Sequence, residues 1–161
     1  MTLMRRVRVA AAVQARMGST RLPGKVLRPI AGRPMLGWIV ARLRACREVD
    51  QIVVSTTAES RDRAIVEYAQ EIRVASVCGS EQDLIQRLLL TASECGADAI
   101  VRITADCPFV DPPLVDRLVH VFRSEEREVD FITNNDPPSF PHGLDAEVIP
   151  TKITLVTHST W

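Results

Sequence analysis

Three basic side chains, Arg16, Arg21 and Lys25, lie within ten residues near the N-terminus of this chain. The segment that carries them also holds two glycines, and it directly follows an apolar run at residues 7–13. Guanidinium groups donate paired hydrogen bonds to phosphate, lysine supplies a mobile positive charge, and glycine lets backbone N–H groups approach an anion closely. The pattern therefore predicts a phosphate-binding loop at the end of a buried strand, in preference to a solvated loop with incidental arginines.

The carboxylate of Asp106 is a second candidate for chemistry, because it follows the apolar segment 99–104 and precedes Cys107 and Pro108. Mg²⁺ at sites that act on phosphates is held by one or two carboxylates together with phosphate oxygens. Asp106 is thus a predicted metal ligand, and the alternative is an aspartate that only caps the turn before the proline. No histidine lies near Cys107 in the sequence to activate it as a nucleophile, which favours a structural thiol.

The elements that position these groups follow from the hydrophobic pattern, in which short apolar runs alternate with segments of helical periodicity. Strands are expected at residues 7–13, 51–56, 73–77, 99–104, 129–133 and 146–149. Helices are expected at residues 34–46, 61–71, 84–95 and 112–122. This alternation predicts an α/β fold of three layers, with a mostly parallel sheet covered by helices on both faces.

Local signals mark the ends of these helices. Ser80 and Asp83 form an S-x-x-D capping signal after a turn at Gly79, Gly96 is a typical residue to follow a helix end, and Asp111 is an expected N-cap. Ligands of such sheets sit at the carboxyl ends of the strands. Residues 14–25, 78–83 and 105–108 are therefore expected to form three walls of one site, although the sequence does not give the order of the strands.

Composition narrows the class of protein. The 161 residues, of which 46% are hydrophobic, fit one domain at residues 1–150 and a short tail at residues 151–161. A formal net charge of +0 argues against a nucleic-acid partner, and no apolar run is long enough to span a membrane. The four cysteines form no CxxC pair, so we expect reduced thiols in a cytoplasmic protein.

Four segments in register resemble the cytidylyltransferase family that includes the CMP-Kdo and acylneuraminate synthetases, and most closely its SpsF-like branch of spore coat polysaccharide biosynthesis. They are residues 14–27, 79–83, 102–108 and 140–148. The resemblance implies a Rossmann-like fold of the nucleotide-diphospho-sugar transferase type. It also implies transfer of CMP from CTP to a sugar or sugar acid, with release of pyrophosphate, in surface polysaccharide biosynthesis.

Roles for individual residues follow from the same resemblance. Arg16 and Lys25 would be catalytic and hold the triphosphate, and Asp106 would bind Mg²⁺. Arg21 would share the phosphate contacts or pair with a carboxylate. The full set of implied nucleotide contacts is Ala12, Ala15, Arg16, Gly18, Ser19, Arg21, Lys25, Ser80 and Asp83, of which the last two also have a sufficient structural role as a cap.

The proline-rich loop that begins at Asn134 is expected to form a lid over the acceptor sugar. The implied acceptor contacts are Arg87, His142, Asp145 and Glu147. Asp145 and Glu147 would hydrogen-bond sugar hydroxyls or help to hold the metal, and the alternative is that both are ordinary carboxylates beside a strand.

After Pro150 the chain departs from the family pattern, whose C-terminal part is expected to be missing. An unfinished sheet edge near Val148 would then favour self-association as a homodimer. Two other functions remain open: a non-catalytic module that binds a nucleotide or sugar nucleotide, and a glycosyltransferase of related fold. The segment 106–108 is not the D-x-D of many glycosyltransferases, but residues 145–147 come close to it.

Overall fold

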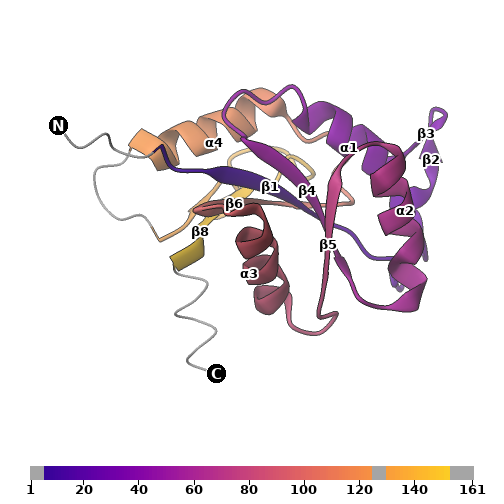
Figure 1. Ribbon diagram of the computed structural model, residues 1–161. Coiled ribbons are helices and arrows are strands. Elements are labelled where there is room, and N and C mark those ends of the chain that lie inside the picture. The colour runs from indigo at the N-terminus through magenta and orange to yellow at the C-terminus, as the bar shows by residue number, and fades with distance from the viewer. Residues whose placement is uncertain (1–5, 125–129, 153–161) are drawn as a thin grey trace.

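A computed structural model describes residues 6–124 and 130–152, and within these residues a six-stranded sheet forms the centre of the molecule (Figure 1). Its strands are β1 (Val9–Gln14), β4 (Gln51–Thr57), β5 (Ala75–Gly79), β6 (Ala99–Thr104), β7 (Ile132–Thr133) and β8 (Glu147–Pro150). The helices are α1 (Met35–Leu43), α2 (Arg63–Glu71), α3 (Leu84–Cys95) and α4 (Pro112–Ser124), with short 3-10 turns η1 (Lys25–Leu27) and η2 (Ser60–Asp62). A small hairpin of β2 (Pro29–Ile30) and β3 (Arg33–Pro34) precedes α1.

The strands are ordered β5-β4-β1-β6-β8-β7 across the sheet. The four strands from β5 to β6 are parallel, and β8 runs antiparallel to both β6 and β7. The chain leaves β1 towards β4, whereas it leaves the neighbouring β6 towards β7 and β8. The connections after β1 and β6 thus diverge, and ligands of open α/β sheets bind at such a point.

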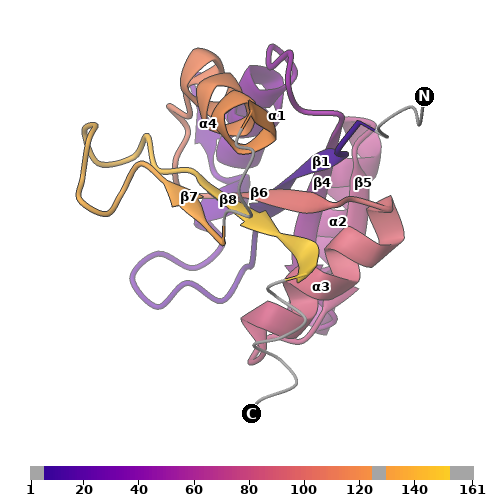
Figure 2. The same ribbon diagram turned by 90° about the vertical axis from the view of Figure 1, so that its left-hand side faces the viewer.

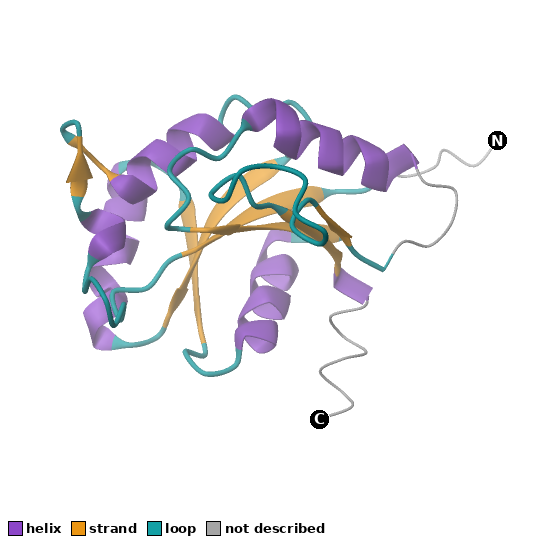
Figure 3. Ribbon diagram, turned by 180° about the vertical axis from the view of Figure 1, so that it is seen from behind, coloured by secondary structure: helices purple, strands orange, loops and turns teal. Residues whose placement is uncertain are grey.

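Alternate residues of β1 pack on opposite faces of the sheet, as the period of two in a strand requires. Ala11 and Val13 belong to the larger core cluster, which also holds side chains of α1, α2 and α4. Ala10 and Ala12 belong to the second cluster with Leu88 of α3. Figures 1 and 3 show the same division, with α3 on one face and the other three helices on the opposite face. The predicted three-layer α/β fold with a mostly parallel sheet is therefore confirmed.

Two predicted element boundaries are wrong. The third strand begins at Ala75 instead of residue 73, because Arg73 follows α2 with a φ of 56°, which is incompatible with an extended strand. It continues through Gly79, for which the sequence predicts a turn.

The N-cap of α3 is Asp83, whose carboxylate accepts the N–H of Gln86 at 2.8 Å. The hydroxyl oxygen of Ser80, three residues before Asp83, accepts the N–H of Asp83 at 3.0 Å.

The predicted ends of two helices are confirmed. Gly96 ends α3 in the left-handed conformation, with a φ of 57°. Asp111 precedes α4, and its carboxylate accepts the N–H of Leu114 at 3.3 Å. Among the residues that the structure describes, no helix is long and apolar enough to cross a bilayer.

The expectation of a free sheet edge near Val148 is wrong, because β8 lies between β6 and β7 (Figure 2). Val148 pairs with Val101 on one side and with Ile132 on the other, and it is fully buried. The predicted strand at residues 129–133 is present as Ile132–Thr133, and residue 129 lies outside the described residues. Most of the predicted tail, residues 153–161, also lies outside them.

The carboxylate of Asp116 is one of the links between α4 and the turn after α1. Asp116 accepts the N–H of Arg47 at 2.9 Å and that of Glu48 at 2.8 Å. We expect Asp116→Ala to lower the free energy of unfolding by about 1–3 kcal/mol, because charged hydrogen bonds of this kind are lost. Urea denaturation measures the change, and Glu94→Ala on the exposed face of α3 is the control. A loss no larger than that of the control would contradict this role for Asp116.

Candidate functional site

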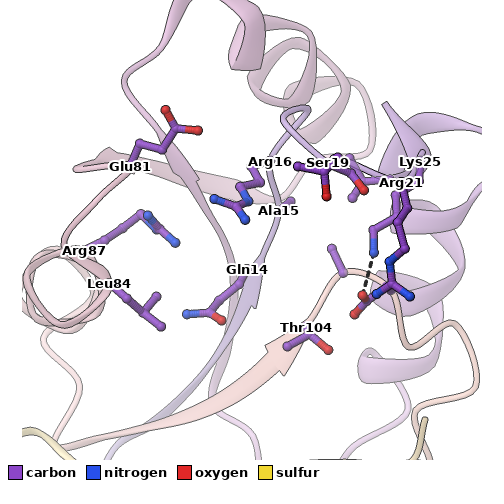
Figure 4. Close-up of a pocket in the computed structure, with 14 residues that line it drawn as sticks. Gln14, Ala15, Arg16, Ser19, Arg21, Lys25, Glu81, Leu84, Arg87 and Thr104 are labelled. Carbon is purple, nitrogen blue, oxygen red and sulfur yellow. Dashed lines mark hydrogen bonds and ion pairs between the residues drawn. The ribbon is translucent and has the colours of Figure 1, made fainter. Parts of the chain in front are cut away.

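A pocket of about 420 Å³ lies at the carboxyl ends of β1 and β6, where the topology places a ligand site (Figure 4). Its walls come from the loop after β1, the start of α3 and the turn after β6. We call residues 14–25 the signature loop. The lining includes seven of the predicted site residues: Ala15, Arg16, Ser19, Arg21, Lys25, Arg87 and Asp106.

The backbone of the signature loop closes on itself at Met17. The carbonyl of Met17 accepts the N–H of Ser19 at 2.9 Å and the N–H of Gly24 at 3.0 Å. Gly24 adopts a φ of 69°, which a side chain would strain, and the chain then enters η1 at Lys25. The residues just before and just after this closed segment are Arg16 and Lys25, so the closure brings the two predicted catalytic cations to one pocket.

Lys25 and Asp106 are in direct contact across 81 residues of sequence, with Nζ 2.6 Å from Oδ2 (Figure 4). This hydrogen bond from Lys25 is the main reason why the pKa of Asp106 lies below its ordinary value of 3.8, while partial burial acts in the opposite direction. Asp106 is therefore ionised at neutral pH. The pair joins the turn after β6 to the signature loop, as expected for two walls of one site.

Arg16 and Arg87 point into the pocket from different walls (Figure 4). Arg87 is only 7% exposed, and its pKa is lowered first by burial and then by the positive charge of Arg16. One of its terminal nitrogens donates to the carbonyl of Ser80, but within the described residues its Nε has no partner. A polyanion in the pocket would relieve the repulsion between the two guanidinium groups.

The charges that line the pocket favour an anionic ligand. Four lining residues are cationic and two, Glu81 and Asp106, are carboxylates, which leaves a surplus of two positive charges in a molecule with a formal net charge of +0. A cleft with walls of low dielectric concentrates such a local field. The arrangement can bind a polyphosphate and offset negative charge that develops on it.

Four of the predicted nucleotide contacts do not line this pocket. Ala12 is fully buried beneath α3. Gly18 lies in the signature loop beside Arg61 and Glu81. Ser80 and Asp83 form consecutive caps at the start of α3, as described above.

The predicted acceptor residues of the 134–147 loop lie outside this pocket as well. His142 is 97% exposed, and its Nδ1 lies 3.4 Å from a carboxylate oxygen of Asp145. Glu147 forms an ion pair with Arg102 of the neighbouring strand β6. Burial is the main cause of the raised pKa of Cys107 in the turn after β6, and the negative charge of Asp145 adds to it.

Of the two carboxylates that line the pocket, Glu81 pairs with Arg61 and Asp106 with Lys25 of the signature loop. No group of three His, Cys, Asp or Glu residues that could hold a metal occurs in residues 6–124 and 130–152. Such a donor set does not fit a metal held entirely by protein, but it fits Mg²⁺, which keeps several waters and completes its shell with substrate phosphates. Within the described residues, Cys46, Cys78, Cys95 and Cys107 are all free thiols, as expected.

Gln14 and Glu81 lie within the predicted walls, but the sequence analysis gave them no individual role, and it did not predict Thr104 as a lining residue. Gln14 ends β1, and its side-chain oxygen accepts from Arg102 at 3.0 Å. Glu81 pairs with Arg61 beneath Gly18. These partners are distant in sequence, so a local pattern gives no sign of them. The position of Gln14 and Thr104 could have indicated them, because both residues end neighbouring parallel strands, where ligands of such sheets bind.

Comparison with known proteins identifies relatives of one kind. A family model described as cytidylyltransferase matches residues 10–139. The spore coat polysaccharide biosynthesis protein SpsF of Bacillus subtilis is 31% identical over 147 residues, which cover 89% of this chain and 59% of that protein. The 3-deoxy-manno-octulosonate cytidylyltransferase of Acidobacterium capsulatum is 31% identical over 159 residues, which cover 96% of this chain and 60% of the relative.

Two solved structures of similar fold are of the same kind of protein as these relatives. A cytidylyltransferase from Leptospira borgpetersenii superposes with a TM-score of 0.91 at 36% identity, over 96% of this chain and 65% of that one. A CMP:2-keto-3-deoxy-manno-octonic acid synthetase, solved with CTP, has a TM-score of 0.74 at 17% identity and shares the fold. The chain thus spans about three fifths of the length of the two sequence relatives named above.

The contact between Lys25 and Asp106 lowers the pKa of Asp106, and this effect can be measured. We expect Lys25→Met to raise the pKa of Asp106, because the hydrogen bond and positive charge are lost while partial burial remains. In the parent chain the ionised carboxylate stabilises the fold above its ordinary pKa of 3.8, and this contribution is lost as the pH falls through the lowered pKa. NMR titration of the Asp106 carboxyl carbon measures the shift, with Arg63→Met as the control. An unchanged pKa in Lys25→Met would contradict the pairing.

Proposed function

This chain belongs to the cytidylyltransferase family, and we propose that it transfers CMP from CTP to a sugar or sugar acid with release of pyrophosphate. The observation that carries the proposal is the pocket at the ends of β1 and β6, in which Arg16 and Lys25 lie with Asp106. A triphosphate is a polyanion, and guanidinium and ammonium groups suit its recognition.

In the proposed reaction, an oxygen of the acceptor bonds to the α-phosphorus of CTP, and the bond from that phosphorus to the bridging oxygen breaks. Pyrophosphate leaves with the bridging oxygen, and the proton of the acceptor hydroxyl passes to water. Arg16 binds the triphosphate, Lys25 offsets charge on the departing pyrophosphate, and Arg21 adds a further positive charge. Backbone groups near Ala15, which lines the pocket, approach the nucleotide.

Mg²⁺ is the proposed metal, and Asp106 would supply its carboxylate oxygen. When bound, the ion would withdraw charge from phosphate oxygens and so stabilise the transition state. The proposal is supported by the hard oxygen donor of Asp106, by its low pKa, and by its place among the phosphate-binding cations.

The proposed acceptor class and pathway rest on the relatives. The names of two of them refer to 3-deoxy-manno-octulosonate and to spore coat polysaccharide, so we propose a sugar-acid acceptor in surface polysaccharide biosynthesis. The 134–147 loop, with His142 and Asp145, is the proposed acceptor wall.

The proposed location is the cytoplasm, which the free thiols in the described residues suit. A homodimer through the edge strand β7 is also proposed, because the exposed Phe131 lies beside that edge.

A glycosyltransferase that uses residues 145–147 as a D-x-D metal motif is less consistent with the geometry. Neither Asp145 nor Glu147 lines the pocket that gathers the cations, whereas Asp106 does. Glu147 pairs with Arg102, and Asp145 accepts the N–H of Gly143 at 3.2 Å. The two carboxylates therefore have different partners, on β6 and within the acceptor loop.

Lys25 is the most direct test of nucleotide binding. We expect Lys25→Ala to weaken CTP binding by about tenfold or more, because a charge-assisted contact is lost, and to leave the free energy of unfolding nearly unchanged. Isothermal titration with CTP and Mg²⁺ measures the affinity. The matched control is Arg63→Ala, which removes an exposed cation of α2 whose partner is Glu67. Equal CTP affinity in Lys25→Ala and Arg63→Ala would sink the assignment.

The proposed role of Asp106 as a metal ligand can be tested through the effect of Mg²⁺ on CTP affinity. We expect Asp106→Asn to abolish most of the increase in CTP affinity that Mg²⁺ produces in the parent chain, because an amide is a much poorer ligand for this cation than a carboxylate. Titrations with and without Mg²⁺ give the two affinities. A Mg²⁺-dependent gain of the same size in Asp106→Asn would show that the ion is bound elsewhere.

A further inference from the structure

Asp62 is a completely buried carboxylate that lies beneath the signature loop and outside every role assigned so far. It ends η2 at the start of α2, and its exposed fraction is 0%. Its Oδ1 accepts the backbone N–H of Met17 at 2.7 Å, across 45 residues of sequence. Its Oδ2 accepts the hydroxyl of Thr57.

The hydroxyl of Thr57 is the second donor to Asp62. The Thr57 oxygen also accepts the N–H of Glu59 at 3.2 Å, which leaves its own proton available for Asp62. A buried carboxylate is costly unless donors satisfy it, and here a backbone N–H and an oriented hydroxyl do so.

Met17 is the residue at which the signature loop closes, so the bond from Asp62 fixes the closure itself. The carbonyl of Met17 accepts from Ser19 and Gly24, while its N–H is held by Asp62. Arg16 immediately precedes this point, and Lys25 immediately follows Gly24. One partly buried hydrogen bond thus orients the backbone that carries both phosphate-binding cations.

We propose that Asp62 is a positioning residue, which holds the signature loop in the conformation that presents Arg16 and Lys25 together to a triphosphate. The inference rests on the proposed function, because it names the loop as the triphosphate site. Asp62 touches neither the substrate nor the reacting atoms in this role. It acts through Met17.

Electrostatics alone would give the opposite result for removal of Asp62. A negative charge beneath an anion site repels the anion, so its loss through the field alone would tighten the binding of CTP. Loss of the hydrogen bond from the Met17 N–H to Asp62 would weaken that binding instead. The sign of the change therefore separates a positioning residue from a charge that merely happens to be near.

Two substitutions of Asp62 make this comparison. Asp62→Ala removes both the charge and the acceptor for the Met17 N–H, and we expect CTP affinity to fall about 10- to 100-fold, the range for loss of a hydrogen bond to a charged group. Asp62→Asn removes the charge but keeps an oxygen for Met17 and an N–H for the Thr57 oxygen. Its CTP affinity should return most of the way to that of the parent chain. Isothermal titration measures both.

The exchange rate of the Met17 amide proton, followed by NMR in the nucleotide-free chain, tests the anchor without CTP. We expect faster exchange in Asp62→Ala and in Thr57→Val, which deletes the hydroxyl donor of Asp62 and serves if the alanine variant does not fold. The control is Asp111→Ala, which removes a carboxylate cap of α4 without touching the signature loop. It should leave the Met17 amide and CTP affinity unchanged.

The outcomes separate this inference from the proposed function. A folded Asp62→Ala that binds CTP as tightly as the parent chain, or more tightly, overturns the inference while the proposed function stands. Unchanged exchange of the Met17 amide in every Asp62 and Thr57 variant that folds overturns it as well. If the parent chain binds no CTP, the proposed function fails, and the exchange rates still decide whether Asp62 anchors the loop.

Discussion

The contact between Lys25 and Asp106 is the interaction on which the site depends, because it joins the loops that leave two neighbouring strands. Both side chains are partly exposed, at 25% and 47%, so the pair adds little to the stability of the fold. Its importance lies in the placement of charge. It holds a cation and a carboxylate at the point where the connections of β1 and β6 diverge, and the order of the strands makes that contact possible.

The same pocket must stay intact when it is empty, although it gathers four cationic side chains. Three carboxylates distribute the opposite charge around them. Asp106 meets Lys25, Glu81 meets Arg61 beside Gly18, and the buried Asp62 holds the backbone of Met17. An anion that enters the pocket therefore meets Lys25 already held by Asp106 and Arg87 already held by the carbonyl of Ser80, so less ordering of these two side chains is required when it binds.

Local patterns were sufficient to predict most of the fold and part of the site. The strand–helix alternation, the cap at Asp111 and the basic loop each depend on a few adjacent residues, and the structure shows them where they were expected. The errors have a different origin. Arg73 ends a helix through its backbone conformation, and β8 is covered by β7 through a pairing of distant segments. Asp62 was missed for the same reason, since its partner lies 45 residues away.

In the proposed reaction this pocket turns CTP over in addition to binding it. Phosphorus NMR of CTP, Mg²⁺ and the chain, with sugar acids added one at a time, follows that turnover. We expect the three triphosphate resonances to give way to pyrophosphate and a single phosphodiester resonance with at least one acceptor. A spectrum in which CTP stays unchanged with every sugar acid, although titration shows that it binds, would rule out CMP transfer and leave a nucleotide-binding module.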